Sequence, residues 1–163
     1  MRSSDLPVLV AALKGPVDEF VRDARVRISI VISGSGQVLG RHGFTSSYEV
    51  MNVASLAAAA YASARALAEL TQTGHWTHMH HAGRKQQLFL APLDTPVEKL
   101  ILVAIFDAES SLGLVRFFFG RLAEQVKAMP ALAGARGSTD AHTFERDLEA
   151  GLDRIFAQGG GEA

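Results

Sequence analysis

Four histidines lie close together in the chain and are the first candidates for chemistry: His75, His78, His80 and His81. In an extended strand, alternate side chains point to the same face, so His78 and His80 would lie next to each other. Two imidazole groups at that separation can bind zinc if a third ligand comes from His42 or from an acidic residue. Exposed strand histidines usually carry no metal, and we therefore expect no metal site here.

No other pattern in the chain specifies a catalytic group. The Gly34-Ser35-Gly36 sequence lacks the Lys-Ser/Thr ending of a P-loop and the third glycine of a dinucleotide loop, so it predicts a hairpin turn. A Ser-His-Asp triad is compatible with the composition, but the G-x-S-x-G elbow of hydrolases does not occur. The acids Asp107 and Glu109 precede an expected helix, where acids commonly serve the helix dipole. We expect a binding module with no cofactor, and a metal-dependent hydrolase that uses the histidines is the enzyme alternative.

The composition favours one nearly neutral domain. A chain of 163 residues can bury one hydrophobic core, and 16 basic against 17 acidic residues attract neither nucleic acid nor an anionic membrane. The absence of cysteine excludes disulfides, thiolate catalysis and cysteine metal ligands, which fits a cytoplasmic protein. Lys14 ends the short apolar stretch near the N-terminus, so we expect no signal peptide. No run approaches the ~20 apolar residues of a membrane span.

Hydrophobic periodicity predicts the order helix, two strands, helix, three strands, helix. Gly15-Pro16 lies inside the first predicted helix and should kink this helix or split it in two. The expected strands are 26–32, 37–42, 76–82, 85–91 and 99–106, with a loop at 92–96. The last strand, KLILVAIF, is apolar on both faces and should lie at the centre of the sheet. The final helix follows a cap at Ser110 or Ser111, and its apolar stripe is Leu112, Val115, Phe119, Leu122, Val126 and Met129.

The alanine-rich stretch 48–70, YEVMNVASLAAAAYASARALAEL, predicts a helix of about six turns. Steps of three and four residues predict one buried face, made of Val53, Leu56, Ala60, Ser63, Leu67 and Leu70. The opposite face is small and poor in charge. Either the helix is buried within a monomer, or it packs on its own sheet with the first face and meets another protein with the second. We favour the second alternative and assign protein binding to Ala58, Tyr61, Ala62, Arg65 and Glu69.

The chain beyond Met129 has a different character. Residues 130–140 are small and typical of a flexible linker, and 141–158 predict an amphipathic helix with Phe144, Leu148, Leu152 and Ile155 on one face. Such a helix is either a latch on its own domain or a detachable interaction element. We therefore expect a folded domain over 1–129, a linker over 130–140 and a C-terminal helix over 141–158.

This order of elements resembles the Roadblock/dynein-light-chain superfamily over about residues 17–129. The resemblance rests on the hairpin VRISIVISGSGQVLG, the small-residue helix, the strand pair WTHMHHAGRKQQLFLAPL and the stretch LILVAIFDAESSLGLVRFFFGRLAEQV. In the last and most specific stretch, Phe106-Asp107 ends an apolar strand and Leu112-Gly113 opens a helix. Within the superfamily the chain looks most like the bacterial MglB type, because His81-Ala82-Gly83 follows Trp76 and a C-terminal helix is added.

The resemblance implies an α/β (α+β) fold of the Roadblock sandwich type. A five-stranded, mainly antiparallel sheet would be flanked by helices in the order α-β-β-α-β-β-β-α, plus the C-terminal helix. It also implies a homodimer in which the long second helices pair and the third strands join two sheets into one.

The resemblance further implies a function as a GTPase regulator. MglB-type proteins, which serve cell polarity and gliding motility, bind a small Ras-like GTPase of the MglA type and accelerate its GTP hydrolysis. A mobile C-terminal helix can bind a separate surface of the GTPase and favour nucleotide exchange. Such regulators need no arginine finger, since they can reposition the switch residues of the GTPase itself. A Roadblock scaffold that only tethers a GTPase or another partner is the alternative.

Overall fold

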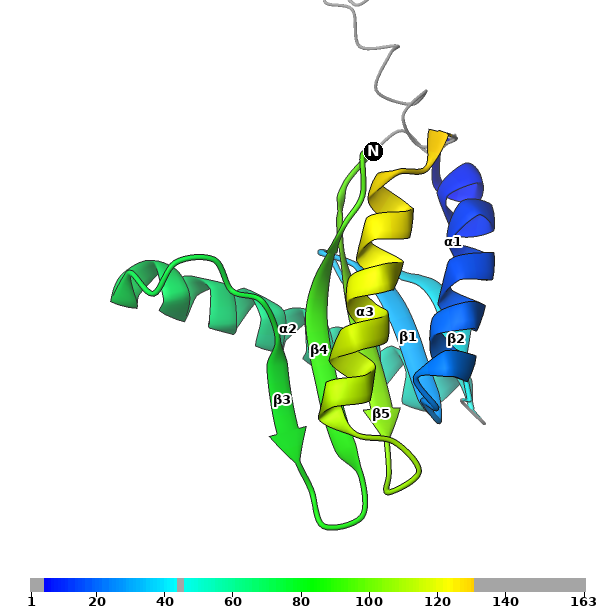
Figure 1. Cartoon of the computed structure of the whole chain (residues 1–163). Helices are drawn as coiled ribbons and strands as arrows, with labels where there is room; N and C mark the ends of the chain where they lie inside the picture. Colours follow the sequence, from blue (N-terminus) through cyan, green and yellow to red (C-terminus); the bar gives the residue numbers. More distant parts are fainter. Residues whose placement is uncertain (1–4, 44–45, 131–163) are drawn as a thin grey trace, which may run out of the picture.

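A five-stranded antiparallel sheet separates two layers of helices in the computed structural model, which describes residues 5–43 and 46–130 (Figure 1). The elements are α1 (Asp5–Asp23), β1 (Ile28–Ser33), β2 (Val38–His42), α2 (Ser47–Thr71), β3 (Met79–Ala82), β4 (Gln87–Asp94), β5 (Lys99–Phe106) and α3 (Leu112–Lys127). The fold class and the order of elements expected from the sequence are confirmed. The C-terminal helix expected over 141–158, and the linker before it apart from Pro130, lie outside the described residues.

The sheet has the strand order β2-β1-β5-β4-β3, and every neighbouring pair is antiparallel. The apolar strand β5 lies at the centre, as its sequence predicts. Its Val103 pairs with Ile30 of β1 on one side and with Leu90 of β4 on the other. Because helices cover both sheet faces, side chains on both faces of β5 are buried.

Two prolines lie inside regular elements, where the sequence predicted a kink or a split at Pro16 and a loop at Pro92. Pro16 neither splits nor ends α1, which is one helix with Leu13 and Phe20 buried on either side of the proline. The burial of these side chains offsets the hydrogen bond that proline removes. Pro92 was expected in a loop but lies in β4, opposite Ile101 of β5. The pairing of β3 with β4 extends only to Leu90, so the other side of β4 is open at Pro92 and the missing N–H costs no ladder bond there.

The helices α1 and α3 lie side by side on one face of the sheet (Figure 1). The predicted stripe of α3 is confirmed: Val115, Leu122 and Val126 are buried, and Leu112, Phe119 and Met129 pack against the same core. Ser111 caps this helix by accepting a hydrogen bond of 3.2 Å from the Leu114 N–H.

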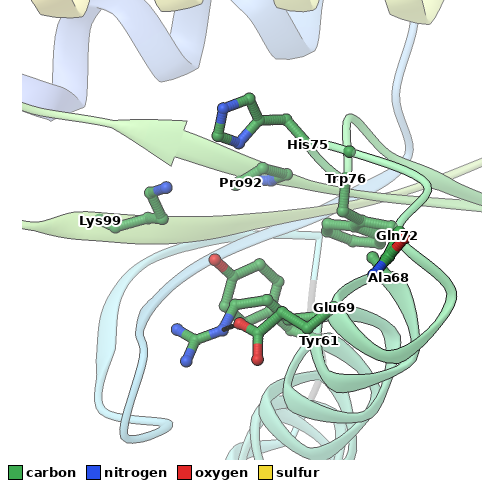
Figure 2. Close-up of a pocket in the computed structure, with 10 residues that line it drawn as sticks. Tyr61, Ala68, Glu69, Gln72, His75, Trp76, Pro92 and Lys99 are labelled. Atoms are coloured by element: carbon green, nitrogen blue, oxygen red, sulfur yellow. Dashed lines mark ion pairs between the residues drawn. The ribbon is translucent and has the colours of Figure 1, made fainter.

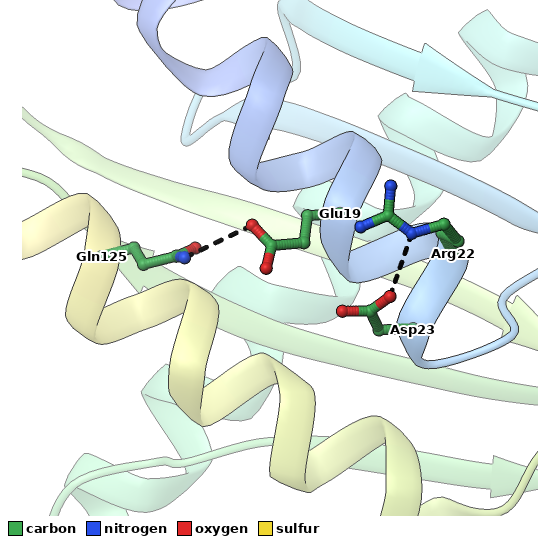
Figure 3. A network of polar contacts seen from close by, with 4 residues as sticks. All are labelled: Glu19, Arg22, Asp23 and Gln125. Carbon is green, nitrogen blue, oxygen red and sulfur yellow. Dashed lines mark hydrogen bonds and ion pairs between the residues drawn. The ribbon is translucent and has the colours of Figure 1, made fainter.

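Polar side chains also link the exposed edges of α1 and α3 (Figure 3). Gln125 Nε2 donates to Glu19 Oε2 at 3.4 Å across the two helices, and Arg22 pairs with Asp23 at 3.1 Å within α1. Exposed contacts of this kind contribute little to stability, so the apolar stripe is what holds α3 on the sheet.

Among the described residues, α2 is the helix that covers the opposite face of the sheet (Figure 1). The sheet presents Ile30, Ile32, Leu90, Ile101 and Val103 on this face. They pack against Val50, Ala54, Ala57 and Tyr61, which are spaced by three and four residues along α2. The buried face that we predicted for α2 is therefore wrong for its leucines, because Leu56, Leu67 and Leu70 are 71%, 60% and 84% exposed. Two other members of that face, Val53 and Ala60, are partly buried against the sheet.

Candidate protein-binding surface

The helix α2 is longer than the sheet that it covers. Its 25 residues span about 37 Å, whereas five strands are about 19 Å wide. Figure 1 shows its C-terminal half extending past the edge strand β3. Ser46 caps the helix by accepting a hydrogen bond from the Glu49 N–H, and the left-handed Gln72 (φ 54°) ends it. Because alanine favours helix without help from packing, the projecting half stays helical although its own sheet does not support it.

The side of α2 that faces the sheet is made mainly of small side chains. Ala54 and Ala57 are 1% and 6% exposed, which lets the helix approach the strands closely. Three large leucines lie on the other side of the helix. We call Leu56, Leu67 and Leu70 the leucine stripe. These residues lie eleven and three positions apart, a spacing that keeps them on one face, and exposed apolar rows of this kind mark interaction sites.

The residues predicted to bind a protein do not form one outward surface. Tyr61 is only 8% exposed, and its ring meets that of Trp76 edge-on at 5.4 Å between centroids. Ala58 is half-buried, and a Cβ added to Gly36 in the β1–β2 turn would lie 3.6 Å from its methyl group. Ala62, Arg65 and Glu69 are exposed, and an ion pair of 3.3 Å joins Arg65 Nε to Glu69 Oε1. Contrary to expectation, Tyr61 faces the sheet rather than a partner, because its ring fills the space left by the neighbouring alanines.

Three of the predicted residues nevertheless line one hollow of about 460 Å³, between the projecting part of α2 and the sheet: Tyr61, Arg65 and Glu69. Figure 2 shows Pro92 and Lys99 on the strands across from the helix, with Trp76 on the segment that leaves it. Lys99 and Pro92 were missed by the sequence reasoning, since no local pattern brings β4 and β5 next to the end of α2. The lining is mixed in charge and the hollow is open, which suits contact with another protein surface.

Of the clustered histidines, His78 and His80 lie on the side of the sheet that carries α3, whereas His75 lines the hollow beside α2. His78 stacks on Phe89 with 5.4 Å between ring centroids, and His80 stacks on Phe106 with 6.4 Å, so the two share one face as expected. Burial, followed by the charge of Arg116 and that of His80, lowers the pKa of His78 below its ordinary value. Over residues 5–43 and 46–130, no three His, Asp or Glu side chains are grouped so that they could hold a metal ion. His80 Nε2 instead lies 2.8 Å from Gln87 Oε1.

None of the three helices in the described part of the chain is long and apolar enough to cross a membrane.

Comparisons with known proteins identify the family of the domain. The model of the Roadblock/LC7 domain matches residues 16–106, which run from the middle of α1 to the end of β5. A search of curated proteins finds no match.

The solved structures similar to this chain include several MglB proteins. Myxococcus xanthus MglB is 26% identical with a TM-score of 0.64, over 71% of this chain and 91% of that one. A structure described as MglB with a tetrameric arrangement is 25% identical with a TM-score of 0.59, over 78% and 90% of the two chains. The gliding protein MglB of Thermus thermophilus shares the fold at 24% identity, with a TM-score of 0.59 over 78% of this chain and 91% of that one. The family match covers more than half of the sequence, and the chain therefore belongs to the Roadblock/LC7 family.

Proposed function

We propose that this protein is a homodimeric regulator that binds a small Ras-like GTPase of the MglA type and stimulates its GTP hydrolysis. The leucine stripe is the observation that carries the proposal. It supplies an uncovered apolar surface on the helix that pairs in Roadblock dimers. The structural similarity to MglB proteins supports the choice of partner.

The first step is the pairing of two α2 helices through their leucine stripes. Burying a leucine side chain contributes about 1.5–3 kcal/mol to the free energy of association. In a two-fold symmetric interface each leucine is buried once in each protomer, so every contribution occurs twice. The small residues Ala59, Ala60 and Ser63 lie between the leucines and let two helix backbones come close. Within the described part of the chain, β3 is an edge strand with one unpaired side, where a second copy can extend the sheet. The tetrameric arrangement described for an MglB protein supports self-association of this fold.

The second step is the binding of the GTPase beside the paired helices. Ala62, Arg65 and Glu69 lie outside the leucine stripe on α2, so they stay accessible at the border of the dimer seam. Together with the adjacent hollow they offer a mixed-charge surface with small side chains at its edge. We assign partner binding to this part of the predicted site and not to Ala58 or Tyr61, which face the protein itself.

We further propose that the protein has no catalytic residue of its own and acts in the cytoplasm. Stimulation then comes from a shift of the switch segments of the GTPase into their hydrolysing conformation. The C-terminal helix expected over 141–158 would add a second contact that favours nucleotide exchange.

The test is GTP hydrolysis by the MglA-type GTPase of the same organism, with and without this protein in excess. We expect faster hydrolysis, together with binding to the GTP-loaded form. Binding without a change in rate would instead establish the scaffold alternative. If neither the GDP-loaded nor the GTP-loaded form binds, the proposal fails.

A further inference from the structure

A second hollow lies at the other end of the sheet, between α1 and the edge strand β2. It measures about 220 Å³, and its apolar lining residues are Val10, Leu13, Val17, Val31 and Leu39. Lys14, Asp18 and Arg41 stand at its rim. We call it the α1–β2 groove. Figure 1 shows α1 and β2 at one side of the molecule and β3, with the projecting end of α2, at the other. Pairing of the leucine stripes therefore leaves the groove open.

We propose that residues 141–158 of the same chain pack into the α1–β2 groove and act as a latch. The sequence of this segment predicts a helix with four apolar side chains on one face, spaced by four, four and three residues: Phe144, Leu148, Leu152 and Ile155. An isolated helix of this length is marginal in water unless its apolar face is covered. Docking of such a face into an apolar groove is a common mode of peptide recognition.

The chain has enough length to reach the groove. The helix α3 ends at Lys127, and Figure 1 shows its end beside the beginning of α1. The ten residues 131–140 can span up to about 33 Å, whereas α1 rises only about 20 Å from its beginning at Asp5 to Asp18. Residues 141–158 can therefore lie along α1 without strain in the linker.

The charges of the two surfaces are complementary. Residues 141–158 carry four acidic and two basic side chains. In the expected helix, Glu145 and Glu149 lie one turn apart at the border of the apolar face. The groove rim carries two basic side chains, Lys14 and Arg41, against one acid, Asp18. Pairing of the two glutamates with the two basic side chains would fix the direction and register of the docked helix.

A latched segment cannot bind another protein with the same apolar face. Docking and partner binding through residues 141–158 therefore exclude each other, and release from the groove would control the second contact. The docking itself does not depend on which partner the protein has.

A fluorescent probe in the groove tests the proposal on the full chain. The protein has no cysteine, so His42→Cys, which changes a groove residue, introduces a single site for an environment-sensitive fluorophore. We expect the probe to be shielded from an aqueous quencher in the parent background. In a Leu148→Asp/Leu152→Asp background, the quenching constant should rise several-fold. A probe at Arg84→Cys in the β3–β4 turn should not respond. Equal quenching at His42→Cys in both backgrounds, or an equal rise at Arg84→Cys, would overturn the latch.

Two valines of α1 provide a matched pair on the groove side. Val10 lines the groove and is 36% exposed, whereas Val8 is 51% exposed and does not line it. Val10→Asp should release the segment as the double aspartate variant does, and Val8→Asp should leave quenching at the parent level. Equal effects of the two substitutions would contradict the assigned groove. Shielding that depends on protein concentration would show docking from a second copy, and shielding only after GTPase addition would assign the groove to that partner. Either result overturns docking within one chain.

Discussion

The helices α3 and α2 cover opposite faces of the same sheet, but the large apolar stripe is buried in α3 and exposed in α2. The stripe of α3 is turned inward, with Val115, Leu122 and Val126 buried against the sheet. In α2 the small residues Ala54 and Ala57 are turned inward, and the leucine stripe is exposed. The comparison shows that the largest apolar residues of a helix need not face the core of its own domain.

The difference follows from how closely each helix approaches the strands. On α3, large side chains interlock with Phe89, and the Phe89 and Phe119 rings lie 5.4 Å apart. Under α2 the sheet itself supplies most of the large residues, such as Ile101 and Val103, and the middle of the helix meets them with Ala54 and Ala57. This arrangement supports the proposal that α2 packs on its own sheet with one face and on a second copy with the other. Four substitutions test this contrast.

The largest expected effect is on the α3 side. Leu122→Ala empties a side chain that is 1% exposed, and such cavities lower the free energy of unfolding by about 2–5 kcal/mol. Phe117→Ala on the same helix is the control, because Phe117 is 62% exposed and its loss should change stability by less than about 0.5 kcal/mol. Urea unfolding at fixed protein concentration measures both. Similar losses for the two variants would mean that α3 has a second covered face.

The leucine stripe should affect association rather than folding. Leu67→Asp places two carboxylates in the proposed seam and removes two buried leucines, which should weaken dimerisation at least about a hundredfold. The far-UV circular dichroism should stay unchanged, since Leu67 is 60% exposed in the monomer. Sedimentation velocity over a concentration series measures the shift. Ser55→Asp, which changes an exposed residue outside the stripe, should stay dimeric. If Leu67→Asp dimerises as tightly as the parent, the dimer interface does not lie on the leucine stripe of α2.

A smaller effect is expected at the border of the seam. Ala62→Arg should leave the fold and the dimer intact, because arginine is a good helix former and the position is exposed. Binding of the GTPase should weaken about tenfold or more, since the complex must exclude the new side chain or bury its charge. Titration with the GTP-loaded GTPase gives the affinity. Ala58→Arg does not provide an equivalent test, because Ala58 is half-buried beside the β1–β2 turn. Unchanged affinity in Ala62→Arg would place the partner elsewhere.

The smallest effect concerns pH. The folded protein lowers the pKa of His78, so between that pKa and the ordinary value of about 6.5 the unfolded chain binds more protons. The contribution of His78 to stability is therefore fully present above about pH 6.5 and declines as the pH falls through the folded-state pKa. His78→Gln should flatten this part of the stability profile and leave partner binding nearly unchanged. Thermal melts at pH values from 7.5 to 5 measure how steeply stability changes with pH. A variant with the parent slope would mean that another group causes it.

Several features could be predicted from local sequence alone. The apolar run KLILVAIF indicated the central strand, the Ser-Gly repeat indicated the β1–β2 turn, and Ser111 was one of two expected caps of α3. Each depends on near neighbours in the chain, through side-chain alternation, turn geometry or a capping hydrogen bond. The spacing of Leu56, Leu67 and Leu70 also indicated correctly that these residues share a face.

The tertiary structure decided whether the leucine face packs on its own sheet. The hydrophobic effect has no direction, so periodicity shows which residues share a face but not whether the face packs on its own sheet or on another protein. Only the folded chain shows that α2 packs on the strands through a face that includes Ala54 and Tyr61 and leaves the leucines exposed. The place of Pro92 in β4 also depends on the tertiary structure, because β3 is too short to pair with β4 at that position. The tertiary structure likewise brings Lys99 and Glu69 into the lining of one hollow. Such contacts join residues far apart in the chain, and their geometry exists only once the sheet and its helices have packed together.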